Sequence, residues 1–277
     1  MADRTVTTLH GRQNFPDLKP LYIGFSDMPL VSISSDQRRP IAKANFVATV
    51  QTRHSNELAH AYLQSARQLC RVSRPNLARE ADRAIRIARA LGIRLKIAAK
   101  VGKGDEDYFR EKIAPLLSDP EVEFLGEINE RSKTEFLGEA QALLFPIDWP
   151  EPFGLVMIEA MACGTPVLAF RQGSVAEIID QGVTGAIIDT MDEAMMILPR
   201  VIALDRRAVR RRFEQRFSSA RIATDYVAVY RSLLKRPSIS ERETTVPMPR
   251  PVLEKRLNEQ GLSGDRAHRA AETDALL

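Results

Sequence analysis

The chain has 277 residues, of which 44% are hydrophobic, so it can bury the core of one full domain and part of another. Its formal net charge of +4 fits phosphate-bearing substrates or an anionic membrane face. Aromatic residues make up only 6% of the chain. Nucleic-acid binding needs basic residues interleaved with exposed aromatic ones, so we expect no nucleic-acid partner.

The chain contains two cysteines, Cys70 and Cys163. Two cysteines exclude a disulfide framework and a tetrahedral zinc cluster. The sequence shows no signal-peptide pattern and no apolar run of about 18 residues. We therefore expect a cytoplasmic protein.

Residues 1–50 carry three short strand patterns, at 7–11, 29–34 and 45–50. They are typical of the end of a Rossmann-like domain. Residues 51–81 show no clean alternation of apolar and polar residues, and we expect an irregular segment there.

From residue 82 to residue 235, helix and strand patterns alternate. Helices are expected at 82–91, 105–117, 132–140, 155–162, 174–180, 192–204 and 218–234. Strands are expected at 94–101, 121–125, 142–145, 165–170 and 183–188. This alternation with short loops predicts an α/β domain with a parallel, doubly wound sheet. In such sheets ligands bind beyond the carboxyl ends of the strands.

Residues 236–277 differ from the rest of the chain. Four prolines occur by Pro251, and large apolar residues are sparse. Such a segment cannot bury enough apolar surface to offset its ordering entropy, so we expect a disordered tail.

The most informative stretch is 151–164, which reads EPFGLVMIEAMACG. Glu151 and Glu159 flank a Phe-Gly turn that opens an apolar helix. A helix N-terminus presents backbone N–H groups and a positive dipole end, which favour a diphosphate. Gly154 allows the backbone to approach a ligand closely. The pattern suits a sugar nucleotide, with Glu159 accepting from ribose hydroxyls and Glu151 facing the sugar.

This stretch resembles the signature of glycosyltransferase family four, the retaining enzymes of GT-B fold. Both the pair of glutamates eight residues apart and the following Ala-Cys-Gly-Thr-Pro-Val match, at 162–167. The resemblance implies a GT-B-like fold, with 82–235 as the near-complete nucleotide-sugar-binding Rossmann-like domain. It also implies that residues 1–50 are a remnant of the acceptor-side domain, with about 100 residues missing.

The resemblance implies the transfer of a hexose from a nucleoside diphosphate sugar to an acceptor hydroxyl, with retention of configuration. The donor is a substrate, and no cofactor or metal is implied; the acceptor is a sugar, a lipid or another small molecule. The implied catalytic residues are His10 on the acceptor side and Glu151. The implied donor-binding residues are Phe153, Gly154, Leu155, Glu159, Arg74 and Arg79. The alternative is a non-catalytic remnant that binds only nucleotide, or nothing.

Residues 51–81 depart from the family pattern, which has a Gly-Arg…Glu-Lys motif that clamps the donor diphosphate. A shift of one base across the codons of residues 54–80, with suitable wobble bases, yields an apolar strand followed by that motif. We therefore hypothesise two compensating frameshifts, near residues 51 and 81. In the translated chain, Arg74 and Arg79 fall where the motif has its Arg and Lys, although Arg is no simple replacement for Lys.

Three further patterns are weaker. The pair Asp105 and Asp107 mimics a metal-binding motif, but acids are common at the start of a helix. Cys163 precedes a glycine at a helix end, where we expect a small buried filler. A basic run predicts either a solvated helix face or a contact with anionic lipid; it comprises Arg206, Arg207, Arg210, Arg211, Arg212 and Arg216.

Overall fold

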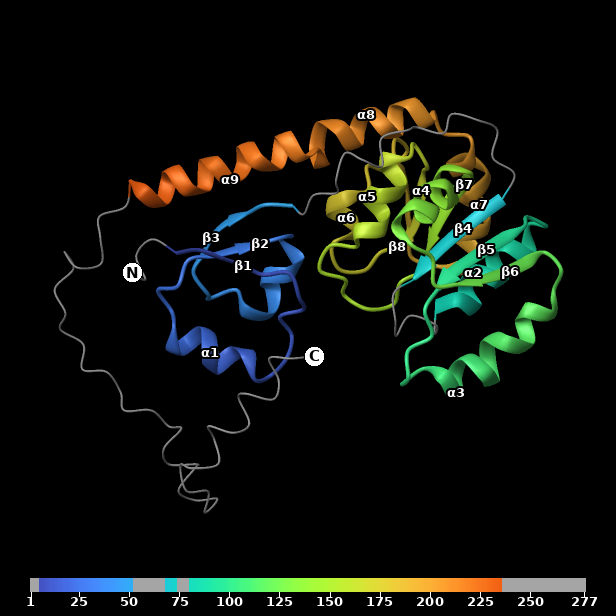
Figure 1. Ribbon diagram of the computed structural model, residues 1–277, viewed down its shortest axis with the longest axis horizontal. Coiled ribbons are helices and arrows are strands. Elements are labelled where there is room, and N and C mark those ends of the chain that lie inside the picture. Colours follow the sequence, from blue (N-terminus) through green and yellow to red (C-terminus); the bar gives the residue numbers. More distant parts are fainter. Residues whose placement is uncertain (1–4, 52–67, 74–79, 236–277) are drawn as a thin grey trace, which may run out of the picture. The chain divides into compact units, whose positions relative to one another are not determined.

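The computed structural model describes residues 5–51, 68–73 and 80–235, which contain two parallel β-sheets (Figure 1). The described residues belong to a compact unit, Met1–Arg236. The predicted tail at 236–277 lies outside the described residues. Within the described part, none of the helices combines the length and the apolar character needed to cross a bilayer.

The first sheet has three parallel strands in the order β1-β2-β3. They are β1 (Thr7–Thr8), β2 (Leu30–Ser32) and β3 (Phe46–Thr49), joined by helix α1 (Leu18–Gly24) and the 3₁₀ helix η2 (Asp36–Ile41). The expected strands are confirmed, whereas α1 and η2 were not expected. Prolines at positions 20 and 40 and the shortness of both helices obscure their periodicity.

The second sheet has six parallel strands in the order β6-β5-β4-β7-β8-β9. They are β4 (Gln68–Ser73), β5 (Leu95–Ala99), β6 (Val122–Gly126), β7 (Ala140–Phe145), β8 (Val167–Phe170) and β9 (Gly185–Ile188). The strand order reverses between β4 and β7, as in a dinucleotide-binding sheet. Ligands bind in the crevice at this switch point, outside the carboxyl ends of the two strands.

Helices cover both faces of the second sheet. They are α2 (Ala81–Ala90), α3 (Glu106–Tyr108), α4 (Glu130–Gly138), α5 (Leu155–Ala162), α6 (Val175–Ile178), α7 (Met191–Ile202) and α8 (Arg206–Phe217). One core cluster joins the strands to α4, α5 and α8 through residues such as Leu137, Met161 and Phe213. The other joins them to α2 and α7 through Ile85 and Leu198. This two-layered covering gives the doubly wound architecture that the sequence predicts.

Strand β4 corrects one expectation, because it lies inside the segment 51–81 that we expected to be irregular. It pairs with β5 on one side and β7 on the other, at the centre of the sheet. The second domain therefore begins before residue 82. The strand was not predicted because Gln68 and Arg71 interrupt the apolar run that is typical of a buried parallel strand.

The helix expected at 105–117 is correct in position but not in regularity. It divides into α3, a π-helical turn η5 (Phe109–Ile113) and a 3₁₀ turn η6 (Ala114–Ser118). Pro115 lacks a backbone N–H, so the α-helical hydrogen-bond pattern cannot continue through it.

The last described helix, α9 (Ser219–Leu234), packs on the first sheet. Ile222 and Val229 contact Val31 and Val50, and the hydroxyl of Tyr226 lies 3.0 Å from Thr8 Oγ1. This helix therefore completes the core of the first sheet with residues from the other end of the chain.

Candidate functional site

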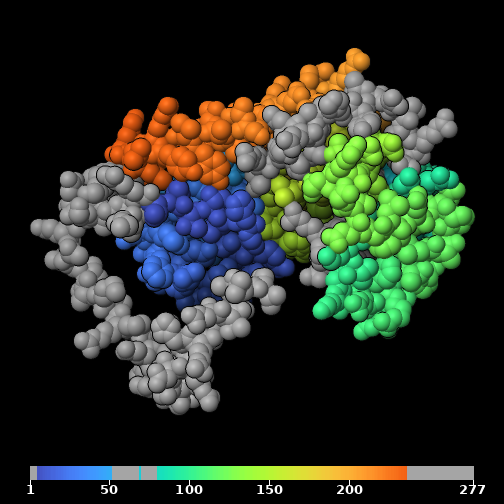
Figure 2. All heavy atoms as spheres, viewed as in Figure 1, coloured from blue at the N-terminus to red at the C-terminus, as the bar shows by residue number. Residues whose placement is uncertain are grey.

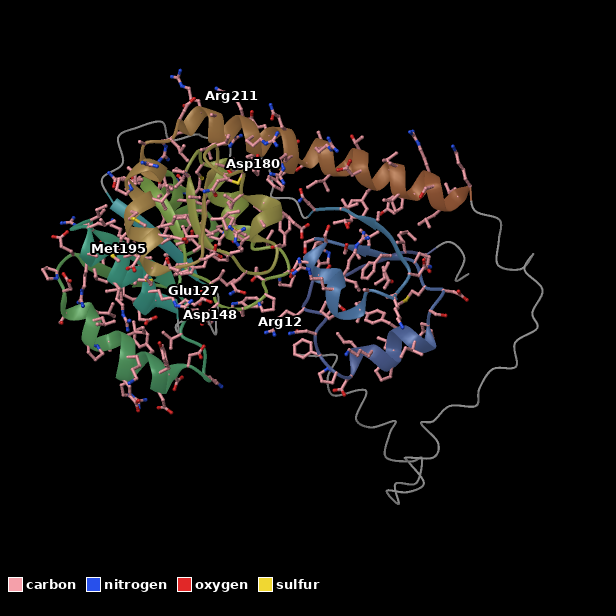
Figure 3. All side chains as sticks on the ribbon, turned by 180° about the vertical axis from the view of Figure 1, so that it is seen from behind. Arg12, Glu127, Asp148, Asp180, Met195 and Arg211 are labelled. Atoms are coloured by element: carbon pink, nitrogen blue, oxygen red, sulfur yellow. The ribbon has the colours of Figure 1, made fainter. Side chains whose placement is uncertain are left out.

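The candidate site lies at the carboxyl edge of the second sheet, next to the switch point. The loop 146–154 leaves the end of β7 and leads into α5. Glu127, which follows β6, and Asp148, which follows β7, lie at this edge of the sheet (Figure 3). The sequence motif 151–159 therefore occupies the place where doubly wound sheets bind ligands.

The Phe-Gly turn is closed by the side chain of Glu151. Its Oε1 accepts hydrogen bonds from the backbone N–H of Gly154, at 3.1 Å, and of Phe153, at 3.4 Å. Gly154 has φ +74°, in the left-handed region that favours glycine. Two amides that we expected to face a donor are thus held by the carboxylate of Glu151, which fills the position of an anionic oxygen at the helix mouth.

The side chain of Phe153 anchors the turn instead of lining it. The ring is 2% exposed and packs edge-on against Phe217 of α8, with the ring centroids 6.1 Å apart. The Phe153 side chain is therefore part of the core, and the N–H of this residue is the group bonded to Glu151. Leu155, the first residue of α5, is partly buried against the same core cluster.

Glu159 lies one turn and a half into α5 and forms an ion pair with Lys133 of α4. Lys133 Nζ lies 2.9 Å from Glu159 Oε1, and the two side chains are 14% and 7% exposed. The neighbouring helices α4 and α5 bring the two residues together (Figure 1). The sequence predicted the glutamate as a site residue but not the lysine.

Lys133 also bonds Glu130, which opens α4 at the surface. The distance from Nζ to Glu130 Oε1 is 2.9 Å, and the Glu130 side chain is 76% exposed. Burial lowers the pKa of Lys133, but the hydrogen bond that Lys133 donates to Glu130 and the charge of Glu159 more than offset that effect and raise the pKa. The ammonium therefore remains charged between an exposed and a buried carboxylate.

A second loop, between β8 and α6, touches the backbone of Glu151. The N–H of Ser174 donates to the carbonyl of Glu151 at 3.0 Å. Gly173 has φ +52°, and a Cβ there would lie 2.4 Å from the Glu151 carbonyl oxygen. Only glycine permits this approach. Sequence reasoning missed both residues, although a glycine just after a strand of a parallel sheet is a usable signal.

The other side of the switch point is formed by the start of α2. Glu80 is 2% exposed, and its Oε1 accepts the N–H of Asp148 at 3.3 Å. Arg83 reaches the same loop, with its guanidinium 3.6 Å from the Asp148 carboxylate. The predicted donor-binding residues Arg74 and Arg79 lie outside the described residues.

His10 follows β1 and is exposed. Two residues later, the guanidinium of Arg12 stacks 5.2 Å from the ring centroid of Trp149. This contact links the segment after β1 to the loop that precedes Glu151. The structure brings the backbone near His10 toward the site, while the role of His10 itself stays a prediction.

The basic run is not a uniformly solvated face, and that interpretation is wrong for several of its members. Arg206 donates to the carbonyl of Gly138, the last residue of α4, at 2.7 Å, and to the carbonyl of Ala140, the first residue of β7, at 2.5 Å. Arg210 donates to the carbonyl of Ala162, the last residue of α5. These guanidinium groups satisfy carbonyls that the ends of helices leave unpaired.

Arg216 does the same for α6, donating to the carbonyl of Ile178 at 3.1 Å and to the carboxylate of Asp180 at 2.9 Å. Asp180 lies beneath α8, whereas Arg211 extends away from it (Figure 3). The outer side of α8 forms part of the molecular surface (Figure 2). The run therefore fastens α8 to three helices, and only members such as Arg207 and Arg211 remain exposed for another partner.

The two acids of the metal-like motif lie in different surroundings. Asp105 is 5% exposed, whereas Asp107 is 85% exposed and bonds Arg110 at 3.0 Å. No group of three or more potential metal ligands occurs among the residues that the structure describes. Cys163 is fully buried, and burial raises the pKa of its thiol to about 11, which agrees with a filler and not with a nucleophile.

Comparisons with known proteins agree with this geometry. The profile of the family described as Glycosyl transferases group 1 matches residues 60–215, more than half of the chain. A phosphatidyl-myo-inositol mannosyltransferase of Mycobacterium leprae is 31% identical over 123 residues, which are 40% of this chain and 32% of that protein. An N-acetyl-alpha-D-glucosaminyl L-malate synthase of Bacillus anthracis is 30% identical over 122 residues, which are 41% of this chain and 31% of that protein. The matches thus span about a third of the length of these relatives.

Solved structures show the same fold. AviGT4, a glycosyltransferase involved in avilamycin A biosynthesis, has a TM-score of 0.62 and 25% identity, covering 75% of this chain and 64% of its own. HepE of Anabaena, solved with UDP and glucose, has a TM-score of 0.69 and 18% identity, covering 82% of this chain and 71% of its own. The α/β fold of GT-B type that the sequence predicted is confirmed.

Proposed function

Because the chain belongs to the glycosyl transferases group 1 family, we propose that it transfers a hexose from a nucleoside diphosphate sugar to an acceptor hydroxyl, with retention of the anomeric configuration. The donor is a substrate, and no metal or other cofactor is part of the proposal. The observation that carries it is the turn 151–154, which opens α5 beside the switch point of the second sheet.

The turn supports binding of the donor sugar nucleotide because a ligand oxygen can take the place of the Glu151 carboxylate oxygen. The N–H groups of Phe153 and Gly154 converge on one oxygen of Glu151 at the N-terminus of α5. Hydrogen-bonding N–H groups that are preorganised in this way stabilise an oxygen on which negative charge develops. In the proposal a sugar or phosphate oxygen takes these hydrogen bonds, and the displaced carboxylate of Glu151 orients the sugar hydroxyls.

The remaining roles follow from position. Glu159 holds the ribose, and the segment after β1, with His10, contacts the acceptor. Arg74 and Arg79 are proposed to neutralise the departing diphosphate, at the first βα turn of the sheet, where such folds bind phosphate. A front-face route, in which the acceptor attacks from the side of the leaving group, gives retention without a protein nucleophile and relies on positioning.

Relatives support the substrate classes only in general terms. They include a phosphatidyl-myo-inositol mannosyltransferase and an N-acetyl-alpha-D-glucosaminyl L-malate synthase, and HepE was solved with UDP and glucose. We accordingly propose a nucleotide-sugar donor, a sugar, lipid or small-molecule acceptor, and a cytoplasmic location. A peripheral contact with an anionic membrane, through the exposed arginines of α8, is a lesser part of the proposal.

The test is ligand binding followed by turnover. Thermal unfolding is measured with UDP-, GDP- and ADP-linked glucose, mannose and N-acetylglucosamine. A bound donor at 100 times its dissociation constant should stabilise the protein by about 2.7 kcal/mol. Release of nucleoside diphosphate is then measured with and without simple glycoside acceptors. Stabilisation without turnover supports the alternative of a nucleotide-binding remnant, and no stabilisation by any donor overturns the proposal.

A further inference from the structure

Lys133 is a charged residue that the proposed roles do not use, although it lies beside a residue that they do. It sits on the second turn of α4, which begins at the carboxyl edge of the sheet just after β6. Its ammonium reaches across to α5 and bonds Glu159 Oε1 at 2.9 Å. Both side chains of this pair are largely buried, at 14% and 7% exposure.

A buried ion pair of this kind is weak evidence for a stabilising role. Removing two charges from water costs several kcal/mol, and their attraction often fails to repay it, so well-packed apolar residues would serve stability as well. The helix that carries Glu159 is otherwise apolar, and its residues Met157, Ile158 and Met161 are fully buried in the core. The pair therefore calls for another explanation, and its location at the candidate site supplies one.

We propose that Lys133 is a positioning residue that fixes the carboxylate of Glu159 in the orientation that accepts the ribose hydroxyls of the donor. This inference rests on the proposed function. Lys133 holds Oε1 of Glu159 on one side, and its second bond, to Glu130 at 2.9 Å, prevents the ammonium from swinging away. A carboxylate held in this way loses little rotational freedom when a ribose diol binds.

The dependence of binding on the ribose hydroxyls distinguishes this role of Lys133 from a general structural one. If Lys133 acts through Glu159 on the ribose, its removal should affect only nucleotides that carry the ribose hydroxyls. If it merely supports the packing of α4 on α5, its removal should weaken all nucleotides alike. The neighbouring Arg131 offers a matched control, because it lies exposed on the same helix.

The experiment measures dissociation constants by calorimetry for UDP, GDP and ADP and for their 2′,3′-dideoxy analogues. The proteins are the wild type, Lys133→Met, Lys133→Arg and Arg131→Met. For Lys133→Met we expect about tenfold weaker binding of the ribose nucleotide, the loss of one oriented charge-assisted contact, and no change for the dideoxy analogue. Lys133→Arg should recover most of the affinity, because a guanidinium can also bond the carboxylate. Arg131→Met should match the wild type for both ligands.

Equal weakening of the ribose and dideoxy nucleotides by Lys133→Met overturns the inference, as does no weakening of either. Equal affinity of the wild type for both ligand types also overturns it, because Glu159 then makes no ribose contact, although nucleotide binding itself stands. Failure of the wild type to bind UDP, GDP or ADP overturns the proposed function and the inference with it.

Discussion

Glu151 and Gly154 close the turn at the start of α5 through a hydrogen bond of 3.1 Å from the glycine N–H to the glutamate carboxylate. The same carboxylate oxygen accepts the N–H of Phe153. Glu151 thus satisfies two backbone N–H groups of the turn that leads into α5. Glu151 therefore stabilises the turn when no ligand binds those N–H groups.

Replacing Glu151 by alanine should destabilise the protein by about 1 kcal/mol, because the N–H groups of Phe153 and Gly154 lose their side-chain acceptor. Glu151→Gln keeps an acceptor oxygen and should cost less. Chemical denaturation measures both free energies of unfolding. Glu135→Ala, an exposed position on α4, is the control. A Glu151→Ala protein as stable as this control would contradict the role of Glu151 in closing the turn.

Glu159→Ala should weaken the binding of a free nucleoside diphosphate more than Glu151→Ala does. The reason is that ribose contacts persist when the sugar is absent, whereas contacts with the sugar do not. Titration calorimetry with UDP and GDP gives the two dissociation constants. Equal losses for the two variants would mean that the roles of the two glutamates are wrongly assigned.

Gly173→Ala should be more destabilising than Gly182→Ala. Both glycines have positive φ, which costs an alanine roughly 1–2 kcal/mol. A Cβ at residue 182 meets nothing within 4 Å, whereas one at residue 173 would lie 2.4 Å from the carbonyl oxygen of Glu151. The clash at residue 173 should add about 1–3 kcal/mol to the destabilisation, as overpacking does. Urea denaturation of the two variants checks the difference, and similar stabilities would show that the loop 171–174 shifts freely.

Arg206→Met should cost about 2–3 kcal/mol of stability, because the carbonyls of Gly138 and Ala140 and the hydroxyl of Thr165 lose a charged donor. Arg207 is exposed one position further along α8, and Arg207→Met should change stability by less than about 0.5 kcal/mol. Thermal unfolding of the pair separates them. A neutral Arg206→Met would restore the interpretation of the run as a solvated face.

The frameshift hypothesis makes a prediction about the gene. Read one base out of frame, the codons of residues 54–80 should encode an apolar strand followed by Gly-Arg…Glu-Lys. Resequencing of the coding DNA decides the matter. Codons that do not yield this peptide in the shifted frame would eliminate the hypothesis, and Arg74 and Arg79 would then be the basic residues to test at the first βα turn.

Much of the second domain was predictable because its elements are strongly patterned. The helix at 155–162 was predicted with the bounds that the structure gives, since Gly154 marks its start and Gly164 follows its end. The parallel sheet followed from the alternation of helices and strands. The strand β4 escaped prediction because the polar Gln68 and Arg71 break its pattern, and only its pairing with β5 and β7 reveals it.

The site was predictable to the extent that one local motif carries it. Glu151 and Glu159 stand out because they flank a glycine turn. Lys133 lies 18 residues before Glu151 and Gly173 lies 19 residues after Gly154, so both meet the motif only in the folded chain. The contacts of the arginines of α8 could not be predicted from the sequence either. A run of basic residues does not say which guanidinium groups find the carbonyls of neighbouring helices, because that depends on how α8 packs.

The place of β4 in the middle of the sheet bears on what a corrected gene would produce. Hydrogen bonds between strands join main-chain atoms that every residue except proline possesses, so another reading of the same codons would leave the topology intact. It would instead replace the side chains of β4 and the basic residues that follow this strand. A protein translated in the shifted frame should therefore keep this architecture and differ chiefly in its affinity for phosphate.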